Sequence, residues 1–451
     1  MRTHLWFLLA VLFLLAGCTK DLEVVSSLSD VRQDVVAEKR QSSTVTTVDG
    51  TLSAFGCSTL TLKTGEIYQI CKPANWNGDL ILYAHGYVSS YLPLAIPTEA
   101  DAYVPLFLSQ GYAFATTSYS ANGLAIQTGI DDMLELRKFF IKQYGTPKNI
   151  YLTGGSEGGI VTTLAIERYP KLFSGGLSLC GPCGDFQRQI NRYGDVRVLF
   201  DYFFPGILPG TAINIPDQLI QNWPGYSGAV GATLINNSEP GGKTWQFLAT
   251  AFGNEELAGF LQSPENIGET VLSLLWYNVF ATRNAVEVLK GQPYDNIGRV
   301  YINPFFAGNP AANAMLNQQV QRIAGDKKAM KTIEKDYQTS GLISVPLVTM
   351  HTAGDPLIPV WHLPLYQQKT LVQGTSALFT GIPINRFGHC TFTQLEVAMA
   401  FGALVQQVSG QMPAITQRLI EKGKATDGKI VQSVNLIRTE ISKNPYAVSA
   451  L

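Results

Sequence analysis

Hydrophobic residues follow two different periods along the chain after residue 78. Continuous apolar runs, typical of strands buried on both faces of a sheet, occur at 79–84, 112–117, 149–153 and 176–179. Between residues 126 and 144 apolar side chains recur at helical spacing, and a second helix is predicted over 157–169, where Pro170 ends it. Strands that alternate with helices imply right-handed crossovers. The pattern therefore predicts an α/β fold with a parallel sheet.

Further elements are predicted outside this region. Two short strands flank a turn at Gly65, and two more strands are expected at 345–351 and 378–386. Residues 185–344 contain apolar stretches that are rich in aromatic residues and largely helical in character. The final stretch, 411–451, is also predicted to be helical, with no role assigned.

Composition narrows the class of protein. The 451 residues include 33 Lys+Arg and 34 Asp+Glu, and 46% are hydrophobic. A net charge of -1 without basic runs offers nucleic acid no counterion-releasing surface, and the hydrophobic share is too high for a disordered chain. The length fits two or three domains, or one large α/β domain with an insertion.

The N-terminus has the pattern of an export signal. A short basic start precedes an apolar run over residues 5–16, which is too short to span a bilayer as a helix. The run Leu15-Ala16-Gly17-Cys18 resembles the lipobox of bacterial lipoproteins, which implies cleavage after residue 17 and lipid on Cys18. We expect a signal peptide at 1–17 and a lipidated tether at 18–45. The alternative is an ordinary secretory signal in which the cysteine occurs by chance.

The expected lipid predicts a location. An acylated terminus anchors a protein because each buried methylene contributes about 0.8 kcal/mol. Thr19 stands where Asp would favour retention in the inner membrane of many Gram-negative bacteria. We therefore expect a bacterial envelope protein, anchored to the outer membrane and facing the periplasm or the cell surface.

Five cysteines follow Cys18, in a compartment where disulfides persist. Because five is odd, at least one thiol is expected to stay free. Cys57 and Cys71 flank the two short strands, so a bridge across this hairpin is geometrically easy. Cys180 and Cys183 form a Cys-x-x-Cys pair, but without a second pair or clustered histidines they lack metal-ligand spacing. No metal or cofactor is predicted.

A possible nucleophile lies between the third strand and the next helix. The segment Gly154-Gly155-Ser156-Glu157-Gly158-Gly159 contains Gly-x-Ser-x-Gly in a strand-turn-helix context. This context allows a tight turn with a strained serine whose hydroxyl is exposed above the sheet. The alternative interpretation is a glycine-rich turn without chemistry.

On these residues, the region 56–410 resembles the α/β-hydrolase fold of serine hydrolases. The resemblance implies a mostly parallel central sheet flanked by helices, with a large, mainly helical cap at 185–344 inserted into a core formed by 46–184 and 345–451. It also implies that an acid and then a histidine follow Ser156 in the chain. Asp355, in a Gly-Asp loop after the strand at 345–351, matches the family's acid. Asp185, past the fourth strand, is its rival.

The histidine can be chosen by elimination among five. His4 lies in the signal, His85 precedes the serine, and His351 lies within the strand that leads to the acid loop. His362 is only seven residues beyond Asp355, too close to come back over the sheet. His389 follows the last predicted strand, where the family places its base, so a triad of Ser156, Asp355 and His389 is expected.

The tetrahedral oxyanion of such a reaction needs preorganised donors. One is expected from the backbone amide of Glu157, after the nucleophile, at a helix N-terminus. The second is assigned to the amide of Tyr87, because His85-Gly86-Tyr87 resembles the family's His-Gly loop. His85 itself is expected to be structural.

One subfamily signature is only half present. Tannases and fungal-type feruloyl esterases join a cysteine beside the catalytic serine to one beside the histidine. Here Cys390 follows His389, but Gly155 precedes Ser156. Cys390 could instead bridge to Cys180 or Cys183 and stiffen the histidine loop, or remain a packed or free thiol.

The sequence thus predicts a membrane-anchored serine hydrolase that cleaves a small-molecule carboxylic ester through an acyl-enzyme intermediate. An apolar cap over the serine would close a pocket suited to an aromatic or acyl group. Two alternatives stay open: a capped serine peptidase of the prolyl type, and an inactive hydrolase-like lipoprotein that only binds a ligand or partner.

Overall fold

The computed structural model describes residues 43–46, 56–101, 103–261 and 263–411. The predicted signal peptide, Cys18, most of the tether and the C-terminal helix after residue 411 lie outside the described residues. Among the described helices, none is long and apolar enough to cross a membrane.

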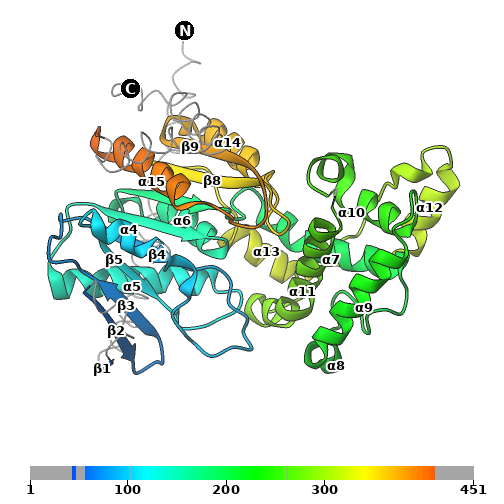
Figure 1. Ribbon diagram of the computed structural model, residues 1–451, viewed down its shortest axis with the longest axis horizontal. Helices are drawn as coiled ribbons and strands as arrows, with labels where there is room; N and C mark the ends of the chain where they lie inside the picture. Colours follow the sequence, from blue (N-terminus) through cyan, green and yellow to red (C-terminus); the bar gives the residue numbers. More distant parts are fainter. Residues whose placement is uncertain (1–42, 47–55, 102, 262, 412–451) are drawn as a thin grey trace, which may run out of the picture.

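A nine-stranded sheet forms the centre of the molecule, with the order β1-β2-β3-β5-β4-β6-β7-β8-β9 (Figure 1). The pairs β1–β2, β2–β3 and β3–β5 are antiparallel, while the remaining pairs are parallel. The strands are β1 (Ser43–Thr46), β2 (Cys57–Leu62), β3 (Ile67–Cys71), β4 (Leu80–Ala84), β5 (Ala113–Thr117), β6 (Ile150–Gly155), β7 (Gly175–Leu179), β8 (Leu347–Gly354) and β9 (Phe379–Phe387).

The central strands are apolar throughout because helices cover both faces of the sheet. In β4, Leu80 and Leu82 pack into one core with α5 and α6, whereas Ile81 and Tyr83 pack into a second core with α4 and α15 on the opposite face. The helices and 3₁₀ turns of this core are η1 (Thr98–Ala100), α4 (Val104–Ser109), α5 (Ile126–Tyr144), α6 (Glu157–Arg168), η2 (Pro170–Leu172), α14 (His362–Gln373), η4 (Ser376–Leu378) and α15 (Gln394–Ser409).

Between β7 and β8 the described chain is helical and extends away from the sheet (Figure 1). It has a hydrophobic core of its own, built around side chains such as Phe200, Phe247 and Leu274. We call this part the cap. Its elements are α7 (Phe186–Phe203), α8 (Asp217–Gln221), α9 (Trp223–Asn236), α10 (Lys243–Gly259, broken at Gly253), α11 (Pro264–Leu289), η3 (Pro304–Phe306), α12 (Pro310–Gln319) and α13 (Lys327–Asp336).

A mostly parallel sheet flanked by helices, with a helical insertion before its last two strands, confirms the predicted α/β-hydrolase fold. The helix at 126–144 has the predicted limits, and the other predicted elements differ by a few residues at their ends. A disulfide joins Cys57 and Cys71, which face each other in the β2–β3 register, as expected for the hairpin. The limits of the domains remain predictions.

Candidate active site

Ser156 occupies a strained turn between β6 and α6. Its backbone has φ 57° and ψ -121°, a conformation that L residues rarely adopt and that often marks a functional site. The turn can form because its neighbours lack side chains: a Cβ atom at Gly158 would overlap the carbonyl oxygen of Ala84 on the adjacent strand. The glycines of the motif therefore bring the serine up against the end of the sheet.

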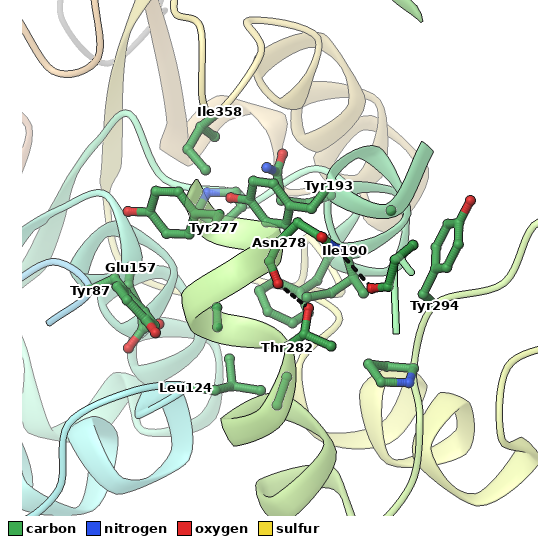
Figure 2. A pocket seen from close by; sticks show the side chains of 18 of the residues that line it. Tyr87, Leu124, Glu157, Ile190, Tyr193, Tyr277, Asn278, Thr282, Tyr294 and Ile358 are labelled. Carbon is green, nitrogen blue, oxygen red and sulfur yellow. Dashed lines mark hydrogen bonds between the residues drawn. The ribbon is translucent and has the colours of Figure 1, made fainter. Parts of the chain in front are cut away.

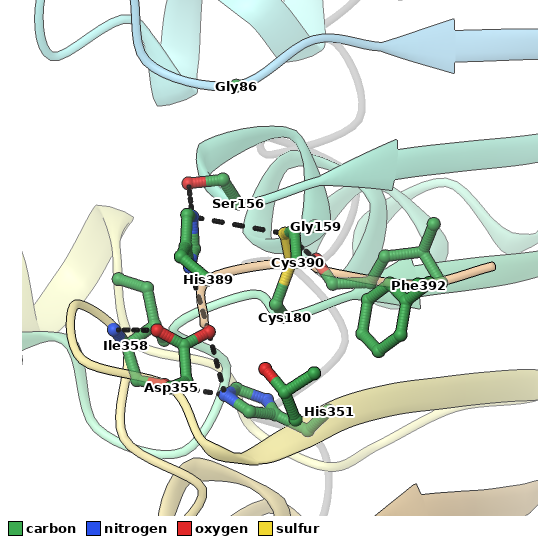
Figure 3. Close-up of a disulfide and its surroundings, with 12 residues drawn as sticks. Gly86, Ser156, Gly159, Cys180, His351, Asp355, Ile358, His389, Cys390 and Phe392 are labelled. Carbon is green, nitrogen blue, oxygen red and sulfur yellow. Dashed lines mark hydrogen bonds and ion pairs between the residues drawn. A yellow bond between two sulfur atoms is a disulfide. The ribbon is translucent and has the colours of Figure 1, made fainter. Parts of the chain in front are cut away.

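Three of the predicted site residues form one chain of hydrogen bonds (Figure 3). His389 Nε2 lies 2.8 Å from Ser156 Oγ, and His389 Nδ1 lies 2.8 Å from Asp355 Oδ2. Ser156 follows β6, Asp355 follows β8 and His389 follows β9, so parallel strands deliver all three side chains to the same edge of the sheet.

The acid is fixed on its other side by backbone groups. Asp355 Oδ1 accepts hydrogen bonds of 2.9 Å from the amides of Leu357 and Ile358, and its side chain is buried. Burial of the imidazole acts to lower the pKa of His389, but the charge and hydrogen bond of Asp355, helped by Glu99 and Glu269, raise this pKa above its usual 6.5. The pair therefore favours a protonated imidazole, the form that follows proton abstraction from a serine.

Asp185, the alternative acid, and His362, the excluded histidine, both make structural hydrogen bonds where the cap joins the core. His362 Nδ1 accepts hydrogen bonds from the amides of Gly184 and Asp185, and its Nε2 donates to Gln189 at 3.0 Å. Asp185 caps the N-terminus of α7 by accepting from the amide of Arg188 at 3.0 Å. Both residues therefore have roles in joining the cap to the core.

Two further histidines are buried and bonded to backbone. His351 Nε2 donates to the carbonyl of Ile358 at 2.6 Å, which supports the acid loop. His85 Nδ1 donates to the carbonyl of Gly86 at 2.7 Å, and its ring stacks on Tyr119. Burial lowers the pKa of His85 to about 4, so this side chain is neutral at pH 7.

The loop after β4 lies against the serine. A Cβ atom at Gly86 would stand 3.2 Å from Ser156 Cβ, and Tyr87 lines the same cavity as Ser156 and Glu157. The amides of Tyr87 and Glu157, the two predicted oxyanion donors, make no hydrogen bond to any residue that the structure describes. Both donors remain free for a ligand.

Glu99 holds this loop and was not foreseen. Its Oε1 accepts hydrogen bonds from the Gly86 amide at 2.7 Å and from the Tyr83 hydroxyl at 3.1 Å. The same carboxylate raises the pKa of His389. Glu99 therefore both holds the loop at Gly86 and adds negative charge near His389. It lies in a 3₁₀ turn that carries no sequence motif.

A second disulfide stands beside the histidine (Figure 3). It joins Cys180, after β7, to Cys390, and Cys183 is a buried free thiol, so one of the open pairings is realised. A Cβ atom at Gly155 would be 3.9 Å from Cys390 Sγ. Cys390 thus faces the position where tannases carry their second cysteine, but bonds to the neighbouring strand. Its sulfur is held in the bridge and is not a thiolate, the form that binds metals.

A cavity that is partly open to solvent adjoins Ser156 between the core and the cap (Figure 2). Its walls are mainly apolar and aromatic. The cap contributes residues of α7 and α11, among them Tyr193 and Tyr277, whose rings stack with centroids 5.2 Å apart. The sequence showed that the cap is rich in aromatic residues, but not which of them turn toward the serine.

Comparisons with known proteins found one matching family and a set of similar solved structures. Residues 30–301 match the family described as a tannase-like family of unknown function (DUF6351). No curated protein matches the chain in sequence. Feruloyl esterase B from Aspergillus oryzae is 16% identical, with a TM-score of 0.43, and the match covers 83% of this chain and 88% of that one. Another Aspergillus oryzae esterase is 14% identical, with a TM-score of 0.43 and coverages of 82% and 85%. Candida antarctica lipase A is 13% identical, also with a TM-score of 0.43, over 84% and 83%.

Proposed function

This chain belongs to the tannase-like family of unknown function DUF6351, and on that premise we propose that it is a serine hydrolase that cleaves carboxylic esters through an acyl-enzyme intermediate. The observation that carries the proposal is the continuous hydrogen-bond chain from Ser156 through His389 to Asp355. A serine hydroxyl is a weak nucleophile at neutral pH, and such a chain is the arrangement that activates it.

In the proposed reaction, Ser156 Oγ attacks the ester carbonyl while His389 Nε2 takes the hydroxyl proton. Asp355 holds the Nδ1–H tautomer and stabilises the imidazolium. The histidine then gives its proton to the leaving alcohol. A water molecule, deprotonated by the same histidine, attacks the acyl-enzyme and releases the acid and free Ser156.

The charge that develops on the carbonyl oxygen requires donors that are already in place. The free amides of Tyr87 and Glu157 flank the serine and are proposed to supply them. Glu157 is the first residue of α6, so its amide also benefits from the positive end of the helix dipole. Removal of one such donor in other enzymes costs about 10²- to 10³-fold in kcat.

The cavity favours an ester over a peptide substrate. A prolyl-type peptidase would need acidic cap residues placed to hold a peptide amine. The cap side chains that line the cavity, within the described part of the chain, are apolar or uncharged, and the acid in the lining, Glu157, belongs to the core beside the serine. The intact hydrogen-bond chain argues equally against an inactive binding protein.

The test uses the full chain in detergent beside its Ser156→Ala variant. Hydrolysis of p-nitrophenyl acyl esters that disappears in the variant would support the proposal, and the chain-length profile would size the pocket. Cleavage confined to aminoacyl p-nitroanilides would favour the peptidase. No turnover, together with no labelling of Ser156 by a fluorophosphonate, would favour the binding protein.

We further propose that Cys18 carries the lipid that anchors the protein to the outer membrane of a bacterial envelope. The proposal rests on the lipobox-like run at residues 15–18. Metabolic labelling with an alkyne fatty acid should mark the wild-type chain and not a Cys18→Ala variant. Equal labelling of both chains, or of neither, would contradict the anchor.

A further inference from the structure

The side chain of Glu157 faces the cavity beside the nucleophile. Glu157 directly follows Ser156, is 9% exposed and lines the same cavity. Figure 2 shows it together with Tyr87 at one end of the cavity, with Tyr294 at the other. Consecutive Cα atoms are about 3.8 Å apart and both residues line one cavity, so the carboxyl group shares that cavity with any ester bound at the serine.

Only one of its two carboxyl oxygens has a partner. Oε1 accepts a hydrogen bond of 3.0 Å from the amide of Ala125, which holds the side chain in place. Oε2 makes no hydrogen bond to the part of the chain that the structure describes, and Glu157 is in no ion pair there. Oε2 is not enclosed by the protein but opens on the cavity, where a group on a bound ligand can reach it.

The surroundings of Glu157 are aromatic and carry no positive charge. Tyr87, Tyr193 and Tyr277 line the same cavity, and burial, with a smaller contribution from the Glu157 carboxyl group, raises the pKa of their hydroxyls. The residues lining the cavity, among those described, include no Lys or Arg. No hydrogen bond joins a tyrosine hydroxyl of the cavity to Oε2 among the described residues, so the second oxygen is open to a group on a bound ligand.

We propose that Glu157 is a substrate-binding residue that selects acyl groups with a hydroxyl or an ammonium group next to the scissile carbonyl. This inference rests on the proposed ester hydrolysis and names the acyl class of its substrate. The rings of Tyr193 and Tyr277 form the wall for the remainder of the acyl group, which favours a planar or aromatic portion.

The protonation state of the carboxyl group is compatible with both substrate groups. Burial raises the pKa of Glu157 to about 8, so the free enzyme at pH 7 holds mainly the neutral acid. In the neutral acid, Oε1 accepts from the Ala125 amide and is the carbonyl oxygen, so Oε2 carries the proton and can donate it to the oxygen of a substrate hydroxyl. An ammonium would instead favour the carboxylate, as an opposite charge at close range does. The two substrate classes can therefore be separated by a variant that cannot ionise.

The experiment compares three methyl esters that differ at one position: 3-phenylpropanoate, its 2-hydroxy analogue (phenyllactate) and its 2-ammonio analogue (phenylalanine). Each is given to the full chain at pH 6.5, and kcat/KM is measured for the wild type, Glu157→Gln and Glu157→Leu. Intrinsic ester reactivity differs among the substrates but cancels when each ratio is compared between variants.

The wild type should prefer at least one substituted ester over phenylpropanoate. In Glu157→Leu we expect this ratio of kcat/KM values to fall about tenfold or more, which corresponds to the loss of one ordinary hydrogen bond. A preference for the hydroxyl should partly survive in Glu157→Gln, whereas a preference for the ammonium should be lost. Thr282→Val is the matched control, because it removes a cavity hydroxyl that already donates to the Asn278 carbonyl; it should leave the ratios unchanged.

Other outcomes count against the inference. Ratios that are equal in the wild type and Glu157→Leu overturn it, as does a similar change in Thr282→Val. Absence of turnover of all three esters while Ser156 still reacts with a fluorophosphonate overturns the acyl assignment alone. Absence of both turnover and labelling overturns the proposed hydrolase, and the inference with it.

Discussion

The disulfide between Cys180 and Cys390 is expected to stabilise the fold and the active site together. The bridge closes a loop of 210 residues, whereas the hairpin bridge from Cys57 to Cys71 closes 14. In the chain-entropy treatment of cross-links, the stabilisation grows with the logarithm of the loop length, which gives about 5 kcal/mol for the long loop and about 3 kcal/mol for the short one. The double variant Cys180→Ala/Cys390→Ala should therefore be the less stable of the two bridge deletions.

The long bridge should also affect catalysis. It ties the residue after His389 to the end of β7, whereas the hairpin bridge lies between two outer strands. A histidine loop that moves by about 1 Å can cost roughly a hundredfold in rate, because proton transfer to Nε2 needs a hydrogen-bonded geometry. We expect kcat to fall between about tenfold and a hundredfold on loss of the long bridge, with no comparable loss for Cys57→Ala/Cys71→Ala.

Urea unfolding followed by circular dichroism measures the free energy of unfolding for the wild type and both double variants. Ester hydrolysis at 25 °C, below each transition, measures kcat. The reasoning is refuted if the long-bridge variant is no less stable than the hairpin variant and retains wild-type kcat. A loss of stability with unchanged kcat would reject the positioning role alone.

Three other predictions follow from single contacts. Gly158→Ala should abolish activity and lower the unfolding midpoint, because the new methyl group would overlap the Ala84 carbonyl; retention of both properties would contradict the packing of the turn. Glu99→Gln should lower kcat, because the loop at Gly86 loses a charged acceptor. The variant should also move the acid limb of the pH–rate profile to lower pH, because a negative charge that raises the pKa of His389 is removed. An acid limb that stays in place would reject this electrostatic role of Glu99. Burial lowers the pKa of His85 from 6.5 to about 4, so between pH 6.5 and 5 the unfolded chain takes up the proton first. The wild type should therefore lose about 1.6 kcal/mol of unfolding free energy relative to His85→Asn over this range, and parallel pH profiles in urea unfolding would refute this.

The predicted triad could be chosen from sequence because each member belongs to a local pattern. Ser156 stands in a glycine-rich turn after an apolar run, Asp355 follows a Gly at a strand end, and His389 was the histidine left after elimination. Strand ends of a parallel sheet meet at one edge, so residues far apart in the chain could be placed together. The structure brings these three side chains within hydrogen-bond distance.

Features that depend on packing between loops could not be predicted in this way. Glu99 reaches the Gly86 amide from a 3₁₀ turn, and no periodicity marks a contact between two irregular segments. The partner of Cys390 stayed open for a similar reason, since Cys180 and Cys183 follow the same strand, and only the backbone turn decides which sulfur faces the histidine loop. Some aromatic residues of the cap pack into its own core and others line the cavity. Which of the two applies depends on how each helix is rotated about its axis, and the spacing of aromatic residues in the sequence does not determine that rotation.

The pairing of Cys180 with Cys390 has a consequence for how the protein matures. Along the chain, Cys57 and Cys71 are neighbours among the cysteines, but Cys183 lies between Cys180 and its partner. A chain oxidised in the order of its synthesis offers Cys183 to Cys180 long before Cys390 arrives. The native bridge then requires exchange through a mixed disulfide, with a thiol that ends buried in the core. Maturation of this protein is therefore expected to depend on a disulfide isomerase rather than on an oxidant alone.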